Sequence, residues 1–274
     1  MFWTRFTGLT DGFDFYNRLR GQVKLDPTST AAEATQNRIK FDKMNGVTSV
    51  VDWTGGTSYD FIDYFFKRAT GFFDVVAYNG SGSNTTQAHN LSVAPEMIIV
   101  KRRSSSEDWL VYSQPTGNQA GTGLNETNAT YTGVTQYWNS TTPTDSVFSL
   151  GTHARVNTSG QTYIAYLFAT LAGVSKVGSY TGTGSFMDID CGFSAGARFI
   201  LIKRTDSSGD WYVWDSERGI VAGNDPYLLL NSTAAEVTST DYIDPLNSGF
   251  RITTAGAEGP LGASGGTYIF LAIA

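Results

Sequence analysis

Carboxylates lie close together at two places in this sequence and could supply the acid and base of a glycoside hydrolase. The two pairs are Asp215 with Glu217, and Asp60 with Asp63. In the internal repeats of this chain, Asn17 and Ser113 occupy the position of Asp215. The carboxylate is therefore absent from the matching position of the other two repeats. Glu236 and Glu33 do match each other, within Ser-Thr-Ala-Ala-Glu, but Ser or Thr there is typical of a capped turn. The sequence therefore gives little support to a polysaccharide depolymerase.

Other reactive side chains are few. His89 and His153 lie 64 residues apart, and Cys191 is the only cysteine. Neither Cys-x-x-Cys nor His-x-x-x-His occurs, so zinc is not predicted. Four aspartates could offer oxygen ligands to calcium, although short Asp-rich stretches are more typical of solvated turns: Asp188, Asp190, Asp241 and Asp244. We expect no enzyme activity, no catalytic residue, no cofactor and no metal site.

Four aromatic residues are the best candidates for contact with a ligand. They are Trp109, Tyr112, Trp211 and Trp214. Residues three apart on a strand point to opposite faces, so one of each pair could be exposed and stack on a sugar. Large aromatic side chains are also the usual anchors of a core or a subunit contact. We favour packing and keep ligand contact as the alternative.

The elements that carry these aromatics recur along the chain. Three blocks recur at an offset of 102 residues: 98–102 with 200–204, 108–112 with 210–214, and 78–83 with 180–185. A third copy is visible near the N-terminus, where 29–35 matches 232–238 at six of seven positions. We therefore predict three tandem units, 1–70, 71–172 and 173–274.

The first unit lacks the front third that the other two have, with its Tyr-x-Gly-x-Gly block. A β unit without its first strands would expose unpaired edges. We expect that the sequence is a fragment or that another chain completes this unit; the alternative is a genuine start at Met1. The junctions between units are short and lack Pro/Ser linkers, which favours a stiff rod.

Composition indicates an all-β fold. Aromatic residues make up 14 %, charged residues only 16 %, and there are 30 glycines. Short apolar runs alternate with turn clusters every 8–12 residues, which predicts antiparallel β-sandwich units. The net charge of −6 argues against nucleic-acid binding. The one basic run, Lys101-Arg102-Arg103, is expected to be a solvated strand end, with a polyanion contact as the alternative.

No apolar run reaches 18 residues, and the N-terminus has no signal-peptide pattern, so we expect no membrane insertion. An extracellular protein of this kind could be released by lysis. Its location would then be outside the cell.

Three blocks carry a family likeness: residues 67–78, 93–103 and 160–169. As a set they resemble a β-rich domain repeated in tail-fibre and other virion proteins of marine bacteriophages. The resemblance implies a structural virion protein, a homotrimer and contacts with other virion proteins, and it supplies no catalytic motif. We expect a tail-fibre component that forms a shaft or a host-attachment module, in contact with a host surface glycan if it lies at the tip. The alternative is a carbohydrate-binding or adhesin module on a bacterial surface.

Overall fold

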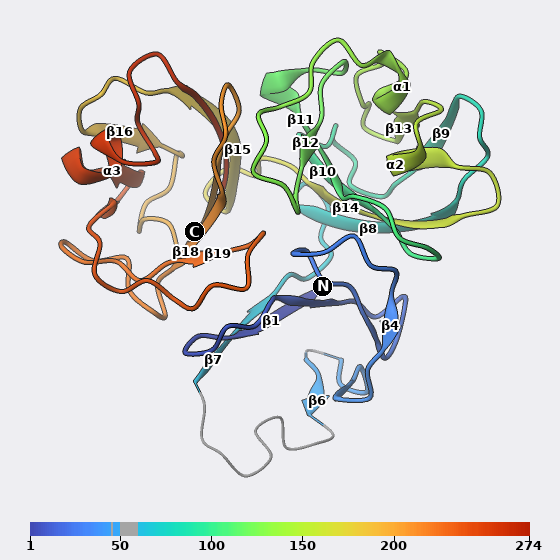
Figure 1. The fold of residues 1–274 in the computed structure, drawn as a ribbon, viewed down its shortest axis with the longest axis horizontal. Coiled ribbons are helices and arrows are strands. Elements are labelled where there is room, and N and C mark those ends of the chain that lie inside the picture. Colours follow the sequence, from blue (N-terminus) through green and yellow to red (C-terminus); the bar gives the residue numbers. More distant parts are fainter. Residues whose placement is uncertain (45, 50–59) are drawn as a thin grey trace.

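A computed structural model describes residues 1–44, 46–49 and 60–274 (Figure 1). The chain is a mostly β protein with several antiparallel sheets and a few short helices. This confirms the β class that the composition predicts. We call residues 1–70 the N-terminal lobe, residues 71–172 the middle lobe and residues 173–274 the C-terminal lobe.

The N-terminal lobe is built on a three-stranded sheet in the order β2-β1-β7. Two small two-stranded sheets, β3-β4 and β5-β6, accompany it. The strands are β1 (Phe2–Phe6), β2 (Asp14–Tyr16), β3 (Val23–Lys24), β4 (Ala34–Thr35), β5 (Ile39–Lys40), β6 (Thr48–Ser49) and β7 (Phe61–Phe65).

The middle lobe has a five-stranded sheet in the order β12-β11-β10-β14-β8, together with a second sheet of β13 and β9. Its strands are β8 (Phe73–Asn79), β9 (Thr85–Ala88), β10 (Met97–Arg102), β11 (Leu110–Ser113), β12 (Thr122–Gly123), β13 (Val147–Leu150) and β14 (Thr162–Phe168). Its helices are η1 (Gln114–Thr116), α1 (Thr135–Trp138) and α2 (Ala154–Asn157).

The C-terminal lobe has a five-stranded sheet in the order β15-β22-β17-β18-β19 and a three-stranded sheet in the order β16-β21-β20. Its strands are β15 (Ser175–Thr181), β16 (Met187–Asp190), β17 (Phe199–Arg204), β18 (Trp211–Asp215), β19 (Leu228–Leu229), β20 (Ile243–Leu246), β21 (Gly249–Ile252) and β22 (Thr267–Ile273). One helix, α3 (Thr254–Glu258), lies between β21 and β22.

Strand register relates the three main sheets to one another. β1, β10 and β17 each lie between a following hairpin strand and the last long strand of their lobe, β7, β14 or β22. Arg5, Lys101 and Lys203 occupy the same place in this frame, because they face Ile62, Ile164 and Ile269 respectively. The register thus defines which positions of the three lobes can be compared.

The three main sheets meet at one common core, and this arrangement is visible in Figure 1 as three groups of strands around a centre. Its buried side chains come from every lobe, including Trp3, Phe66, Trp109, Phe168 and Trp211. The middle and C-terminal lobes each have a further core of their own on the other face of the sheet. Within this chain the lobes therefore gather around shared apolar side chains, whereas the short junctions led us to expect them in line.

Candidate functional site

The structure places Trp109 and Trp211 in the common core, where both side chains are fully buried. Their indole N–H groups donate across the boundary between lobes. Trp109 Nε1 donates to the carbonyl of Asp26 at 3.1 Å, and Trp211 Nε1 donates to that of Gly123 at 2.8 Å. Each tryptophan therefore links its own sheet to the backbone of the preceding lobe.

Tyr112 and Trp214 lie on the opposite face, in the separate cores of the middle and C-terminal lobes. Tyr112 packs edge-on against Trp138, with ring centroids 5.6 Å apart, and Trp214 stacks on Tyr212 at 5.6 Å. All four candidate aromatics are at most 1 % exposed, so they present no surface on which a sugar could stack. Their placement is that of the packing alternative.

A ring of buried cations joins the three lobes. Arg5, Lys101 and Lys203 are each at most 2 % exposed, and each donates to backbone carbonyls of another lobe. Lys101 Nζ reaches the N-terminal lobe, Lys203 Nζ reaches the middle lobe and the Arg5 guanidinium reaches the C-terminal lobe. The carbonyl acceptors are those of Thr30 at 2.9 Å, Thr127 at 3.0 Å, and Leu229 and Ser232 at 2.7 and 2.9 Å.

Burial changes the acidity of these cations. Removal from water lowers the pKa of both Lys101 and Lys203 to about 8 and that of Arg5 to about 10. No carboxylate forms an ion pair with any of the three within the described chain. Carbonyl dipoles therefore replace water around each cation. A lysine within an otherwise apolar strand was the sequence signal for this ring, and sequence reasoning missed it.

Backbone hydrogen bonds close the same ring. The N-terminal lobe donates to the middle lobe from Glu33 N to Arg103 O at 2.9 Å, and the middle lobe donates to the C-terminal lobe from Thr130 N to Thr205 O at 2.8 Å. The C-terminal lobe returns to the N-terminal lobe, from Glu236 N to Thr7 O at 3.1 Å. The three acceptors lie two residues after the three buried cations. One contact geometry is thus used three times in cyclic order.

An additional polar lock secures the contact of the C-terminal lobe with the N-terminal lobe. Arg218 pairs with Asp215 at 2.6 Å and with Glu236 at 2.8 Å, and the Tyr64 hydroxyl donates to Asp215 at 2.7 Å. Burial is the main cause that raises the pKa of Tyr64 well above its ordinary value. Asp215 and Glu236, two carboxylates considered for catalysis, are thus held in ion pairs beneath the contact.

The matching lock between the N-terminal and middle lobes uses Arg20, Asn17 and Tyr166. Asn17 Nδ2 donates to the Tyr166 hydroxyl at 3.0 Å, and Arg20 donates to the same oxygen at 3.3 Å. Arg20 also pairs with Glu33 at 3.4 Å. Asn17 therefore fills the place that Asp215 has in the C-terminal lobe.

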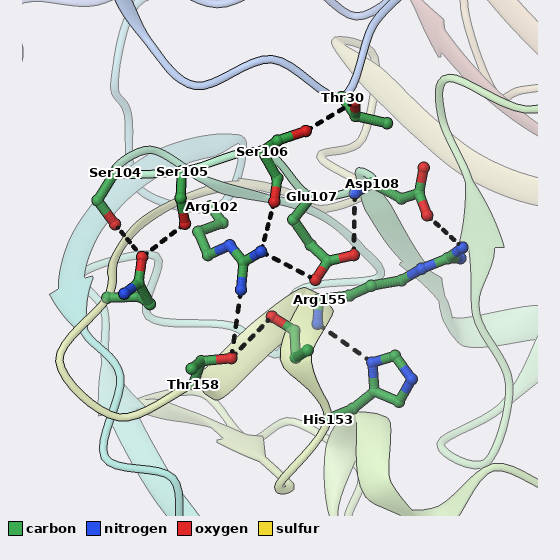
Figure 2. Close-up of polar contacts among 12 residues, drawn as sticks. Thr30, Arg102, Ser104, Ser105, Ser106, Glu107, Asp108, His153, Arg155 and Thr158 are labelled. Atoms are coloured by element: carbon green, nitrogen blue, oxygen red, sulfur yellow. Dashed lines mark hydrogen bonds and ion pairs between the residues drawn. The ribbon is translucent and has the colours of Figure 1, made fainter.

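The side chains of the basic run at the end of β10 have partners within the chain. Arg102 pairs with Glu107 at 3.2 Å (Figure 2). Arg103 pairs with Glu33 at 2.8 Å. Lys101 is fully buried. The expected solvated strand end is therefore wrong for Lys101, because the loop of the N-terminal lobe covers it.

The side chains near this run also have structural partners (Figure 2). Arg155 pairs with Asp108 at 2.7 Å and with Glu126 at 2.6 Å. His153 Nδ1 accepts from the backbone N–H of Arg155 at 3.1 Å and so caps α2. Burial lowers the pKa of His153 and of His89. Both imidazoles therefore favour the neutral form, and His153 serves the start of a helix.

Cys191 is not in a reactive environment, and the aspartates considered for calcium are not grouped as metal ligands within the described residues. Cys191 is buried, and burial raises the pKa of its thiol to about 12, which disfavours the reactive thiolate. Asp188 pairs with Arg251 at 2.6 Å. Among the residues that the structure describes, no three His, Cys, Asp or Glu side chains are grouped to hold a metal ion.

None of the helices in the described part of the chain is long and apolar enough to cross a membrane.

Asp225 is a carboxylate with strongly altered acidity. It is fully buried, and its oxygens accept from the backbone N–H groups of Val221 at 3.0 Å and Ile243 at 3.3 Å. Burial, with Asp241 and Asp244 nearby, raises its pKa to about 7. Asp225 thus links the loop that contains Val221 to the start of β20 and stabilises that loop.

The surface beside β7 in the N-terminal lobe is a candidate place for a partner. A hollow of about 360 Å³ lies beside β7, lined by apolar side chains that include Met1, Phe2, Leu19, Phe41 and Phe65. Phe61 and Phe65 of β7 are 57 % and 55 % exposed. Exposed aromatic rings beside an apolar hollow are typical of a docking surface. This surface can bind apolar groups, and it presents no arrangement for catalysis among the described residues.

Comparison with known proteins adds a family to this description. The chain matches none of the curated proteins and none of the solved structures. Residues 66–274, which span the middle and C-terminal lobes and more than half of the chain, match a family model described as a domain of unknown function, DUF7483. The chain therefore belongs to the DUF7483 family.

Proposed function

We propose that this chain is a structural component of a bacteriophage virion, a tail-fibre element that forms a shaft or a host-attachment module. Its residue blocks resemble a domain repeated in such proteins, and its composition is that of a low-charge β scaffold. In this proposal the protein works outside the cell after lysis, and it contacts other virion proteins.

The ring of matched contacts is the observation that carries the proposal. Buried cations, backbone bonds and tryptophan N–H groups link the lobes in cyclic order. Such cross-linking suits a component that must resist force, and two of the carboxylates considered for catalysis, Asp215 and Glu236, serve in its ion pairs. We take the three lobes as copies of one unit, the first of them shortened.

A rod and a homotrimer belong to the same proposal. Since the three lobes of one chain share a core, a rod would arise by stacking such three-lobed bodies along one axis. Homotrimers are the usual state of tail fibres, and symmetric association would cover the sheet edges that remain open. Native mass spectrometry of the full chain would test this, with a species of three times 29.7 kDa expected.

Immunogold electron microscopy tests the proposal as a whole. Antibodies against residues 71–274 are applied to particles from the source, and the same antibodies pre-absorbed with the purified chain serve as the control. Gold along thin tail fibres is the expected result, and its position separates shaft from tip. Gold on cell surfaces, with particles unlabelled, would overturn the proposal in favour of a bacterial adhesin.

A further inference from the structure

β7 differs from its two counterparts by the number of its neighbours. β14 lies between β10 and β8, and β22 lies between β17 and β15. β7 pairs with β1 alone within the described chain. A strand in the place of β8 or β15 is therefore the element that the described N-terminal lobe does not have.

The backbone of β7 is oriented to receive such a strand. Phe66 N donates to Met1 O, and Asp60 O accepts from Thr7 N, so alternate residues from 60 to 66 bond toward β1. In an antiparallel strand the residues between them point their N–H and C=O groups to the other side. Phe61, Asp63 and Phe65 thus present these groups at the open edge.

Phe61 presents a ring at the position where the other two lobes have an aromatic stack. Its matched residues are Tyr163 and Tyr268, each at the start of the pairing with the central strand. Tyr163 stacks on Tyr78 of β8 at 5.2 Å, and Tyr268 stacks on Tyr180 of β15 at 4.8 Å. The exposed face of Phe61 therefore matches a surface that is covered by a tyrosine twice in this same chain.

The outer strands also share a second residue. Val75 of β8 faces Tyr166, and Val177 of β15 faces Leu271, both three residues before the stacking tyrosine. The position that matches these two partners in β7 is Tyr64. A strand that completes the N-terminal lobe in the same way has the pattern Val-x-x-Tyr.

We infer that β7 binds an extended Val-x-x-Tyr strand of another polypeptide, antiparallel to β7, with the tyrosine on Phe61 and the valine beside Tyr64. This inference deepens the proposed function, because it names the kind of virion partner that completes the N-terminal lobe. Three Val-x-x-Tyr segments occur in the chain, at 75–78, 134–137 and 177–180, and the tyrosine of each is buried or half-buried in its own lobe. The described residues of a folded second copy therefore offer no free segment of this kind, and the inference assigns the strand to a different polypeptide.

A synthetic peptide with the sequence of residues 73–79 serves as the probe, and fluorescence anisotropy measures its binding to the full chain. We expect saturable binding with a dissociation constant below about 1 mM. Phe61→Ala should weaken binding about fivefold through the lost ring stack. Phe186→Ala is the matched control, since Phe186 is 59 % exposed but lies in the C-terminal lobe, and it should leave binding unchanged.

Peptide N-methylation tests strand pairing without altering the protein. In β8 the N–H groups of even-numbered residues point to β14, as the bond from Gly80 N to Gln161 O shows. N-methylation at Val76 should therefore abolish binding, while N-methylation at Ala77 should be tolerated. Absence of binding, or equal binding by both methylated peptides, would overturn the inference and leave the immunogold result untouched.

Discussion

The contact of the C-terminal lobe with the N-terminal lobe and the contact of the middle lobe with the C-terminal lobe share one frame but differ at two matched positions. The first contact has Asp215 and Tyr64 at these positions, and the strand register places Ser113 and Leu271 at the matching positions of the second. Tyr64 and Asp215 are hydrogen-bonded, whereas the hydroxyl of Ser113 is buried without a partner among the described residues. Both arrangements are compatible with the ring, because each contact also has a buried cation and a backbone hydrogen bond between the lobes. These two interactions fix how the lobes pack.

The difference shows which contact between lobes depends on particular polar side chains. A buried carboxylate needs a paired cation, so Asp215 and Arg218 must be present together. Ser113 makes no such demand on its surroundings. We therefore expect the contact between the C-terminal and N-terminal lobes to depend on individual residues more strongly than the contact between the middle and C-terminal lobes does.

Removal of the Arg218 side chain should have the largest effect. Arg218→Met leaves Asp215 buried without its cation and also loses the pair with Glu236, so we expect a loss of about 3–5 kcal/mol in the free energy of unfolding. Urea unfolding followed by tryptophan fluorescence measures it. Arg198→Met removes a cation from the exposed pair with Glu217 and should cost less than about 0.5 kcal/mol. Equal losses in both variants would contradict the lock.

Lys203→Met should have the next largest effect, on the second contact. The methionine fills similar space but leaves the carbonyls of Thr127 and Gly209 without their donor, at a cost of about 2–3 kcal/mol. The same unfolding measurement applies, with Lys176→Met as the control, since Lys176 lies on the outer strand β15. A loss no greater than that of the control would show that the buried cation is dispensable.

The cost of Lys203→Met should also grow with pH. Burial lowers the pKa of Lys203 from its ordinary value of 10.5 to about 8, so the folded chain releases this proton before the unfolded chain does. The contribution of Lys203 to the free energy of unfolding therefore rises between about pH 8 and 10.5. Wild type and variant are compared at neutral and at alkaline pH. A difference that shrinks as the pH rises would contradict the burial of a charged amine.

Tyr64→Phe should have a smaller effect, because it removes one hydroxyl and keeps the ring. The lost hydrogen bond is made to a charged partner, so we expect a loss of about 1.5 kcal/mol. Tyr166→Phe is the matched variant. Each hydroxyl accepts from an arginine at 3.3 Å, but the second partner is the charged Asp215 for Tyr64 and the neutral Asn17 for Tyr166, so Tyr166→Phe should cost less. Thermal unfolding of the two variants side by side gives the comparison, and the reverse order would refute the stronger lock at Asp215.

Ser113→Ala should have the smallest effect. The buried hydroxyl of Ser113 has no partner among the described residues, so its removal costs no hydrogen bond. We expect a change within about 0.5 kcal/mol, with a gain in stability as the favoured direction. A clear loss in urea unfolding would reveal an unseen bond of this hydroxyl.

Much of the local structure follows from the sequence. The apolar run before Lys101 predicts the strand that the structure shows as β10, and its match before Lys203 predicts β17. The turn clusters after these runs separate β10 from β11 and β17 from β18. Short apolar runs bounded by turn residues mark such strands locally, so one sequence suffices to find them.

The candidate site could be predicted only incompletely. The sequence offered burial as one of two roles for Trp109 and Trp211, and it interpreted Lys101 as belonging to a solvated strand end. The structure buries all three, because segments about 70 to 90 residues away in the sequence cover them. Nothing local marks such partners, since the acceptors are backbone carbonyls that every residue has.

The sequence by itself determined the β class, the positions of the main strands and the matching of residues at an offset of 102. The tertiary structure alone decided that the three sheets share one core, that buried cations close a ring between them and that β7 keeps an open edge within the described chain. The physical reason is that a strand's pattern records which face is apolar. Which other sheet covers that face depends on packing between residues far apart in the chain.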